Sequence, residues 1–131
     1  MQSIQSGGTF AIDGAPGAGV AAGTILIASG ANAGNAKVST AKAAKFLGVT
    51  QEASDAKGYA AVAQYGVVDV VAGAGGVAFG DLIASDAAGA GVTVVPAANG
   101  AAVTQVVGVA LTAAIAGASF KMLIQPSLTL S

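Results

Sequence analysis

The 131-residue sequence has no cysteine, histidine, tryptophan or arginine. Without cysteine and histidine it lacks the usual zinc ligands, any disulfide framework, a thiol nucleophile and a Ser-His-Asp triad. A formal net charge of −1 without arginine suits nucleic acid poorly, because neutralising phosphates supplies most of that affinity. We therefore expect no enzyme, no catalytic, cofactor-binding or metal-binding residues, no cofactor and no nucleic-acid partner.

Large side chains are also scarce. Aromatic residues make up 5% of the chain and charged residues 8%, whereas glycine contributes 20 residues and alanine about a quarter. Hydrophobic residues still reach 54%, which argues against a disordered polyelectrolyte. The length suits one domain, or two small lobes that share a core. Because such a core would be thin, we expect the chain to form a homo-oligomer.

Residues 87–120 carry no charge, and residues 101–120 have the length of a membrane-spanning helix. Thr104 and Gln105 interrupt this window, and neither a basic cluster nor an aromatic belt flanks it. We expect a buried β-rich segment here and keep a membrane span as the alternative. The first residues show no basic region followed by an apolar run, so we expect no targeting signal and no export of the protein.

Short runs of valine, isoleucine and leucine alternate with glycine-bearing turns, which is typical of β-strands. The main runs are residues 24–27, 46–49, 65–71, 92–95, 103–111 and 120–124. Asp81 and Asp86 bracket a further strand, and Gly58 and Gly117 each lead into one. A short helical turn is predicted over residues 39–47, capped by Ser39 or Thr40 and ended by Gly48. The fold class is therefore mainly β, a small β-barrel or β-sandwich-like domain of β-tulip type with at most one or two short helices.

The two halves of the chain resemble each other. Residues 20–26 align with residues 77–83, and residues 46–53 align with residues 106–113, so that two Gly-Val pairs coincide. This order predicts two pseudo-repeats, about 19–72 and 73–131, within one β-rich domain over 19–131. Chance self-similarity of a chain rich in glycine, alanine and valine is the alternative.

Residues 1–18 form a predicted N-terminal arm, polar and rich in glycine. Its few bulky apolar side chains include Ile4, Phe10 and Ile12, too few to build a core. Such a segment either frays as a terminus or pairs with another sheet as an added strand.

No motif supplies an active site. The glycines of residues 17–23 precede a strand instead of following one, so they do not form a dinucleotide-binding turn. Asp69 lies inside a predicted strand, where alternation places it on the solvent face. Lys37, Lys42 and Lys45 form a modest basic patch, either a solvated face or a contact for an acidic protein surface.

Three stretches, taken in order, resemble the head-decoration or capsid cement proteins of tailed phages. They are YGVVDV at 65–70 followed by GGVAFGDLIASDAAG at 75–89, VVGVAL at 106–111, and the Ala-Gly pair at 116–117 leading to MLIQPS at 122–127. The resemblance covers roughly residues 19–127. These are turn-and-strand patterns, and their order and spacing together carry the resemblance.

The resemblance implies a structural virion protein that binds the outer surface of the expanded capsid as a homotrimer, or as a dimer. It would clamp neighbouring major capsid proteins and stabilise the head against internal DNA pressure. The residues expected to contact the capsid are Ile4, Phe10, Ile12, Lys42 and Lys45.

Two other functions remain open at this point. One is a small phage membrane protein of the lysis type, based on the uncharged segment. The other is a carbohydrate-binding or adhesive β-module on a particle surface, whose aromatic platform would draw on Phe10, Phe46, Tyr59, Tyr65, Phe79 or Phe120.

Overall fold

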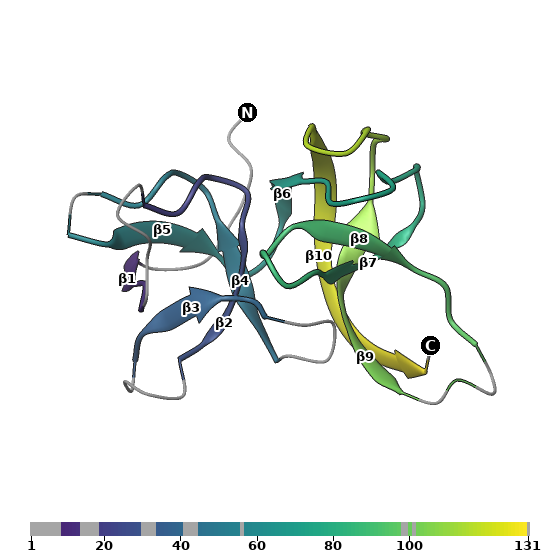
Figure 1. Cartoon of the computed structure of the whole chain (residues 1–131), viewed down its shortest axis with the longest axis horizontal. Helices are drawn as coiled ribbons and strands as arrows, with labels where there is room; N and C mark the ends of the chain where they lie inside the picture. Colours follow the sequence, from purple (N-terminus) through teal and green to yellow (C-terminus); the bar gives the residue numbers. More distant parts are fainter. Residues whose placement is uncertain are drawn as a thin grey trace.

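Two five-stranded antiparallel sheets make up the computed structural model (Figure 1), which describes residues 9–13, 19–29, 34–40, 45–55, 57–97, 100 and 102–130. No helix occurs among these residues. The first sheet contains β1 (Thr9–Ala11), β2 (Ile25–Ala28), β3 (Ala36–Val38), β4 (Phe46–Thr50) and β5 (Tyr59–Ala63). The second contains β6 (Val67–Val71), β7 (Leu82–Ser85), β8 (Gly91–Val94), β9 (Val103–Ala110) and β10 (Ser119–Leu130). The mainly β fold predicted from the sequence is confirmed.

The two sheets have the same topology. Their strand orders are β1-β5-β4-β2-β3 and β6-β10-β9-β7-β8, so each strand of the second sheet corresponds to the strand five places earlier. We call β1–β5 the first lobe and β6–β10 the second lobe. In each lobe one parallel bridge joins the two edges of the sheet, Ile12 to Ala36 and Ala72 to Gly91. Each sheet is therefore strongly curled without closing into a barrel.

The strand register supports the sequence alignment of the halves. Leu26 pairs with Gly48 as Ile83 pairs with Gly108, and the valine after each glycine pairs with the residue before these, Ile25 and Leu82. The two Gly-Val pairs thus occupy the same place in each lobe. Strand β6, however, belongs to the second sheet, although the expected repeat boundary near residue 72 put it in the first half.

The helical turn predicted over residues 39–47 is wrong for its described residues. Ser39 and Thr40 are irregular, and Phe46 and Leu47 begin β4; residues 41–44 lie outside the described residues. Phe46 and Leu47 instead pair within the sheet, because β4 lies between β2 and β5. Strand β10 also runs six residues beyond the predicted end at 124, and the short β3 was not predicted.

The largest core cluster draws on both lobes. Ile25, Val49 and Ala63 of the first lobe pack with second-lobe residues that include Val68 and Val70. A smaller cluster, centred on Leu26 and Val62, fills the first lobe alone. The two sheets therefore share one hydrophobic core.

Packing differs between equivalent sites inside the lobes. Phe120 of β10 occupies the position that Ala60 has in β5, and Gly91 occupies the position of Ala36. A Cβ atom on Gly91 would lie 2.8 Å from the Phe120 ring. The large ring and the missing side chain therefore compensate for each other in the second lobe.

Backbone hydrogen bonds also join the lobes directly. The Val71 N–H donates to the Gly23 carbonyl at 3.1 Å, and the Ile25 N–H donates to the Gly89 carbonyl at 2.8 Å. Gly89 has a φ of 79°, and a Cβ there would lie 2.6 Å from Thr24 Cγ2 and 2.9 Å from Val38 Cγ1. The turn between β7 and β8 thus fits against the first lobe only because residue 89 has no side chain.

The repeat provides a matched control for this contact. Gly34 is the first-lobe equivalent of Gly89. Gly34 precedes Asn35, whose carbonyl accepts the N–H of Ser29. Gly89 likewise precedes Ala90, whose carbonyl accepts the N–H of Asp86. The φ of Gly34 is 82°, and a Cβ there would meet nothing within 4 Å.

We expect both Gly34→Ala and Gly89→Ala to lower the free energy of unfolding by about 1–2 kcal/mol, because alanine is strained in the left-handed backbone conformation. Gly89→Ala should lose about 1–3 kcal/mol more, because its methyl group overlaps the first lobe. Denaturant unfolding followed by far-ultraviolet circular dichroism measures both free energies. Equal losses would show that the close contact at Gly89 is not a constraint.

Candidate functional site

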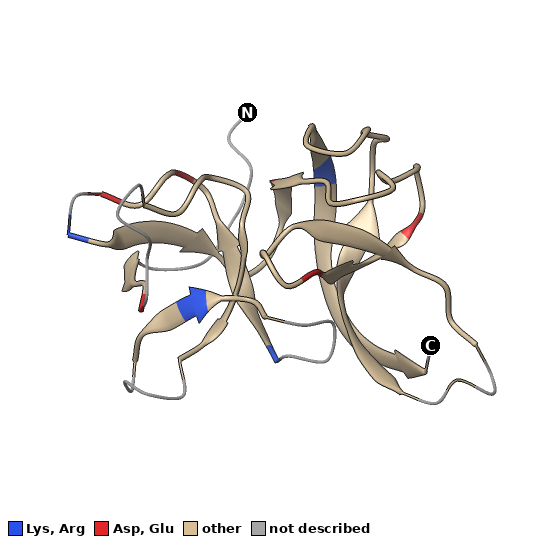
Figure 2. Cartoon of the chain, in the orientation of Figure 1, with Lys and Arg blue, Asp and Glu red and all other residues tan. Residues whose placement is uncertain are grey.

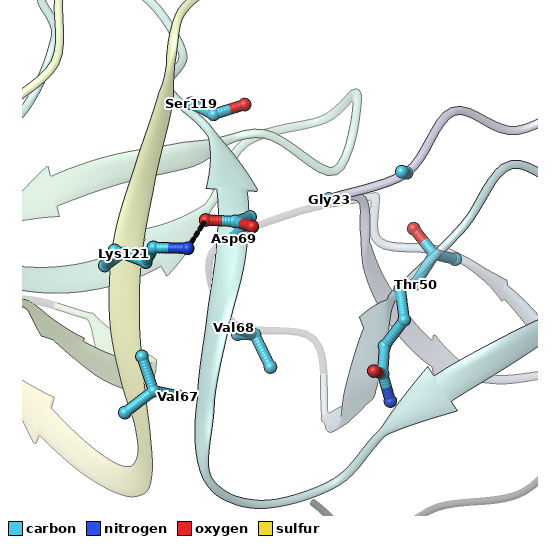
Figure 3. Close-up of a pocket in the computed structure, with 9 residues that line it drawn as sticks. Gly23, Thr50, Val67, Val68, Asp69, Ser119 and Lys121 are labelled. Atoms are coloured by element: carbon cyan, nitrogen blue, oxygen red, sulfur yellow. Dashed lines mark ion pairs between the residues drawn. The ribbon is translucent and has the colours of Figure 1, made fainter. Parts of the chain in front are cut away.

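A cleft of about 480 Å³ opens between the two lobes. Its lining comes from the turn before β2, the end of β4, strand β6 and the start of β10 (Figure 3): Ala22, Gly23, Thr50, Gln51, Val67, Val68, Asp69, Ser119 and Lys121. The two strands that carry its charged groups are neighbours in the second sheet.

The charged groups of the cleft pair with each other. Asp69 faces Lys121 across the β6–β10 ladder, and Lys121 Nζ lies 2.8 Å from Asp69 Oδ1. The two side chains are 60% and 55% exposed, as expected for a solvent-facing position in a strand. An exposed pair of this kind contributes at most about 1 kcal/mol. The lining contains no second carboxylate, so the cleft lacks the pair of acids that general acid–base chemistry uses.

Thr50 has a structural role at the edge of this cleft. Its hydroxyl accepts a hydrogen bond from the Thr24 N–H at 2.9 Å and donates to the Ala21 carbonyl at 2.9 Å. The second lobe has Ala110 at the equivalent strand position and keeps the same backbone contacts to the preceding turn. The hydroxyl therefore holds the turn before β2 against the end of β4.

Three further carboxylates, those of Asp81, Asp86 and Asp13, also fix turns. Asp81 accepts hydrogen bonds from the Ala78 N–H at 2.9 Å and the Thr93 hydroxyl at 2.8 Å. Asp86 accepts from the N–H groups of Ala88 and Ala90 at 2.8 and 2.9 Å. These two acids bracket β7, as the sequence predicts. Asp13 similarly joins the end of β1 to Ser29 and Asn35.

Asp55 shapes the turn that precedes β5. Its carboxylate accepts hydrogen bonds from the N–H groups of Tyr59, at 3.0 Å, and Lys57, at 2.9 Å. These bonds, led by the one from Tyr59, hold the pKa of Asp55 below its ordinary value of 3.8. The low pKa is thus explained by a structural turn and is not a sign of catalysis.

Among the described residues, no group of three or more Asp and Glu side chains is gathered to hold a metal ion. The same part of the chain contains no helix that is long and apolar enough to cross a membrane. The helical membrane span, kept as an alternative from the sequence, has no support in the strands that residues 103–110 and 119–130 form.

Three of the residues predicted to contact a capsid, Phe10, Ile12 and Lys45, lie within the described part of the chain. Ile12 is 6% exposed and lies in the core of the first lobe, against which the half-buried Phe10 also packs. Lys45 is exposed before β4, while Ile4 and Lys42 lie outside the described residues. Residues 9–11 of the predicted arm form β1, which pairs with β5. The capsid role of these residues stays a prediction, and Ile12 could contact a partner only if its segment left the sheet.

Several large apolar side chains are exposed, and of these the sequence motifs indicated only aromatic ones such as Phe79. Three are at least 76% exposed: Ile115 (80%) and Phe79 (76%) at turns of the second lobe, and Val95 (76%) directly after β8. Others lie toward the far end of β9 and β10, including Val103 and Leu128. The sequence shows these residues as members of apolar runs, and only the fold separates them from the core.

Comparisons with known proteins give one informative result. Neither a protein-family model nor a curated protein sequence matches the chain. Among solved structures, the chain is similar to the N base of the head fiber protein gp8.5 of bacteriophage phi29. The TM-score is 0.64 and the sequence identity 20%, and the match covers 98% of this chain and 99% of that one. At this identity the likeness shows a shared fold over the whole length.

The turn at Asp55 gives a pH test. Because its folded-state pKa is lowered, the carboxylate stabilises the fold above its ordinary pKa and loses that effect as pH falls through the folded-state value. We expect Asp55→Asn to reduce the free energy of unfolding at pH 7, and the gap from the unmodified chain to close on acidification below about pH 4. Urea unfolding at a series of pH values measures the gap. A gap that stays constant down to pH 2.5 would contradict the assignment.

Proposed function

We propose that this chain is a structural protein of a phage head, bound to the outer surface of the capsid as a homo-oligomer, with a trimer favoured. In this role it clamps neighbouring major capsid subunits and stabilises the head against the pressure of packaged DNA. The proposal requires no catalytic centre and no cofactor.

The observation that carries the proposal is the fold. A phage head fiber base shares it over practically the entire length of both chains. The turn-and-strand stretches at 65–89, 106–111 and 116–127 independently resemble phage head-decoration proteins. Both likenesses lead to proteins of the phage head, although they rest on different properties of the chain.

The chemistry of the surface is consistent with this role. The cleft contains a solvent-exposed ion pair, and the carboxylates of Asp55 and Asp86 accept hydrogen bonds from backbone N–H groups of their turns. Large apolar side chains nevertheless remain exposed on the second lobe. A protein that binds through many copies needs only modest contacts in each, because linked copies multiply weak contacts.

The direct test uses empty, expanded heads of the phage that encodes the chain, prepared without it. We expect the purified chain to co-sediment with these heads and to saturate at a fixed number of copies per head. Heads that already carry the full complement should take up no labelled chain, which controls for non-specific adhesion. Absence of saturable binding would contradict the proposal.

Clamping predicts a second, separate effect. Heads saturated with the chain should resist disruption to a higher temperature than bare heads, because the bound copies stabilise the assembled state. Light scattering during heating measures the midpoint of disruption. Binding without a rise in this midpoint would contradict the clamp and leave an attached but non-stabilising head protein.

A further inference from the structure

Two turns of the second lobe are fastened together by a single antiparallel bridge. The N–H of Val77 donates to the Ala114 carbonyl at 2.8 Å, and the N–H of Ala114 donates back to the Val77 carbonyl at 3.0 Å. The Gly80 N–H also donates to Ala110 at 2.8 Å, and Asp81 holds the N–H of Ala78. Phe79 and Ile115 extend from these two turns. We call this pair of side chains the apolar tips.

The first lobe contains the same turns. Its residues 20–24 match residues 77–81, because the Gly23 N–H donates to Thr50 as the Gly80 N–H donates to Ala110. In the same way, the Ser54 N–H donates to Val20 as the Ala114 N–H donates to Val77. Phe79 therefore corresponds to Ala22, and Ile115 corresponds to Asp55.

This correspondence shows which side chains the fold of the turns requires and which it does not. Ala22 and Asp55 are exposed, as Phe79 and Ile115 are, and the first-lobe turns form with a methyl group and a carboxylate there. The backbone therefore does not require a phenyl ring or a branched aliphatic chain at these positions. The apolar surfaces of Phe79 and Ile115 are therefore not explained by these turns and are available for contact with a partner.

The tips are also presented in a way that favours tight contact. The bridge and the Asp81 hydrogen bonds fix both turns before any partner arrives, so little backbone freedom is lost on binding. Aromatic anchors that enter a partner's pocket frequently dominate the binding energy of protein interfaces.

Charge restricts the kind of partner. Residues 72–80 and 111–118 contain no charged side chain, and Figure 2 shows the connection between β9 and β10 without either colour. Nearby Lys121 is paired with Asp69, and Asp81 is held within its turn. An anionic lipid surface or a nucleic acid would require free basic residues here. In a second copy of the chain, the cleft between the lobes could receive the Phe79 ring only by desolvating the Asp69–Lys121 ion pair, which is unfavourable.

From the bridged turns and their first-lobe equivalents, we infer that Phe79 and Ile115 are the docking surface for an uncharged, apolar depression on another protein. This inference rests on the proposed function, under which that protein is the capsid shell. The second lobe then faces the shell, and the first lobe retains the equivalent turns without the anchors.

The test compares Phe79→Ser and Ile115→Ser with the unmodified chain in binding to the empty, expanded heads. Each substitution should weaken binding roughly thirtyfold, as expected for loss of an interface anchor. Leu128→Ser is the matched control, because Leu128 is also exposed (68%) but lies near the opposite end of β10. All three variants should keep the thermal midpoint of the free chain, since none of these side chains is buried.

The outcomes distinguish the inference from the function it rests on. If the unmodified chain binds heads and both tip variants bind equally well, the tips are not the docking surface, while the proposed function stands. If the unmodified chain does not bind heads, the proposed function fails and takes this inference with it. Loss of the homo-oligomer in the tip variants, measured by light scattering, would assign the tips to contacts between copies and overturn the inference. Flotation of the unmodified chain, but not the tip variants, with phosphatidylcholine–phosphatidylglycerol vesicles would overturn it in favour of a lipid surface.

Discussion

The close approach of two backbones at the junction between the lobes is the constraint on which the structure depends. Gly89 brings the β7–β8 turn against Thr24 and Val38, where its carbonyl accepts the N–H of Ile25. Gly23 accepts the N–H of Val71 at the neighbouring contact. Because these contacts are made by backbone atoms, small residues are needed there. They also bring Ile25 and Val49 into the same core as Val68 and Val70.

The repeated topology lets each lobe serve as a reference for the other. What both lobes share, such as the bridge between their edges and the Gly-Val pairs, is required by the fold. A feature that only one lobe has is not required by the shared topology. Phe120 with Gly91 is a difference in packing, whereas Phe79 and Ile115 are differences at the surface that the fold does not explain.

Much of the architecture could be predicted from the sequence, because short valine-rich runs between glycines specify strands in this chain. The alignment of the halves places the Gly-Val pairs correctly for the same reason. The helical turn predicted over residues 39–47 was wrong at Phe46 and Leu47, because their pairing with β2 and β5 is a long-range contact that local helix preference does not reveal. The burial of Ile12 could not be read either, because it depends on a bridge to Ala36, 24 positions later in the chain.

The surface was less accessible to prediction than the core. In the sequence, Phe79 is one apolar residue among many, and its exposure follows from a turn closed by Asp81. Electron cryomicroscopy of the complete virion tests the central claim most directly. The account predicts density for this chain on the outer surface of the head, with the turns at residues 77–81 and 111–118 against the shell. Virions without this density, or with those turns directed into solvent, would contradict it.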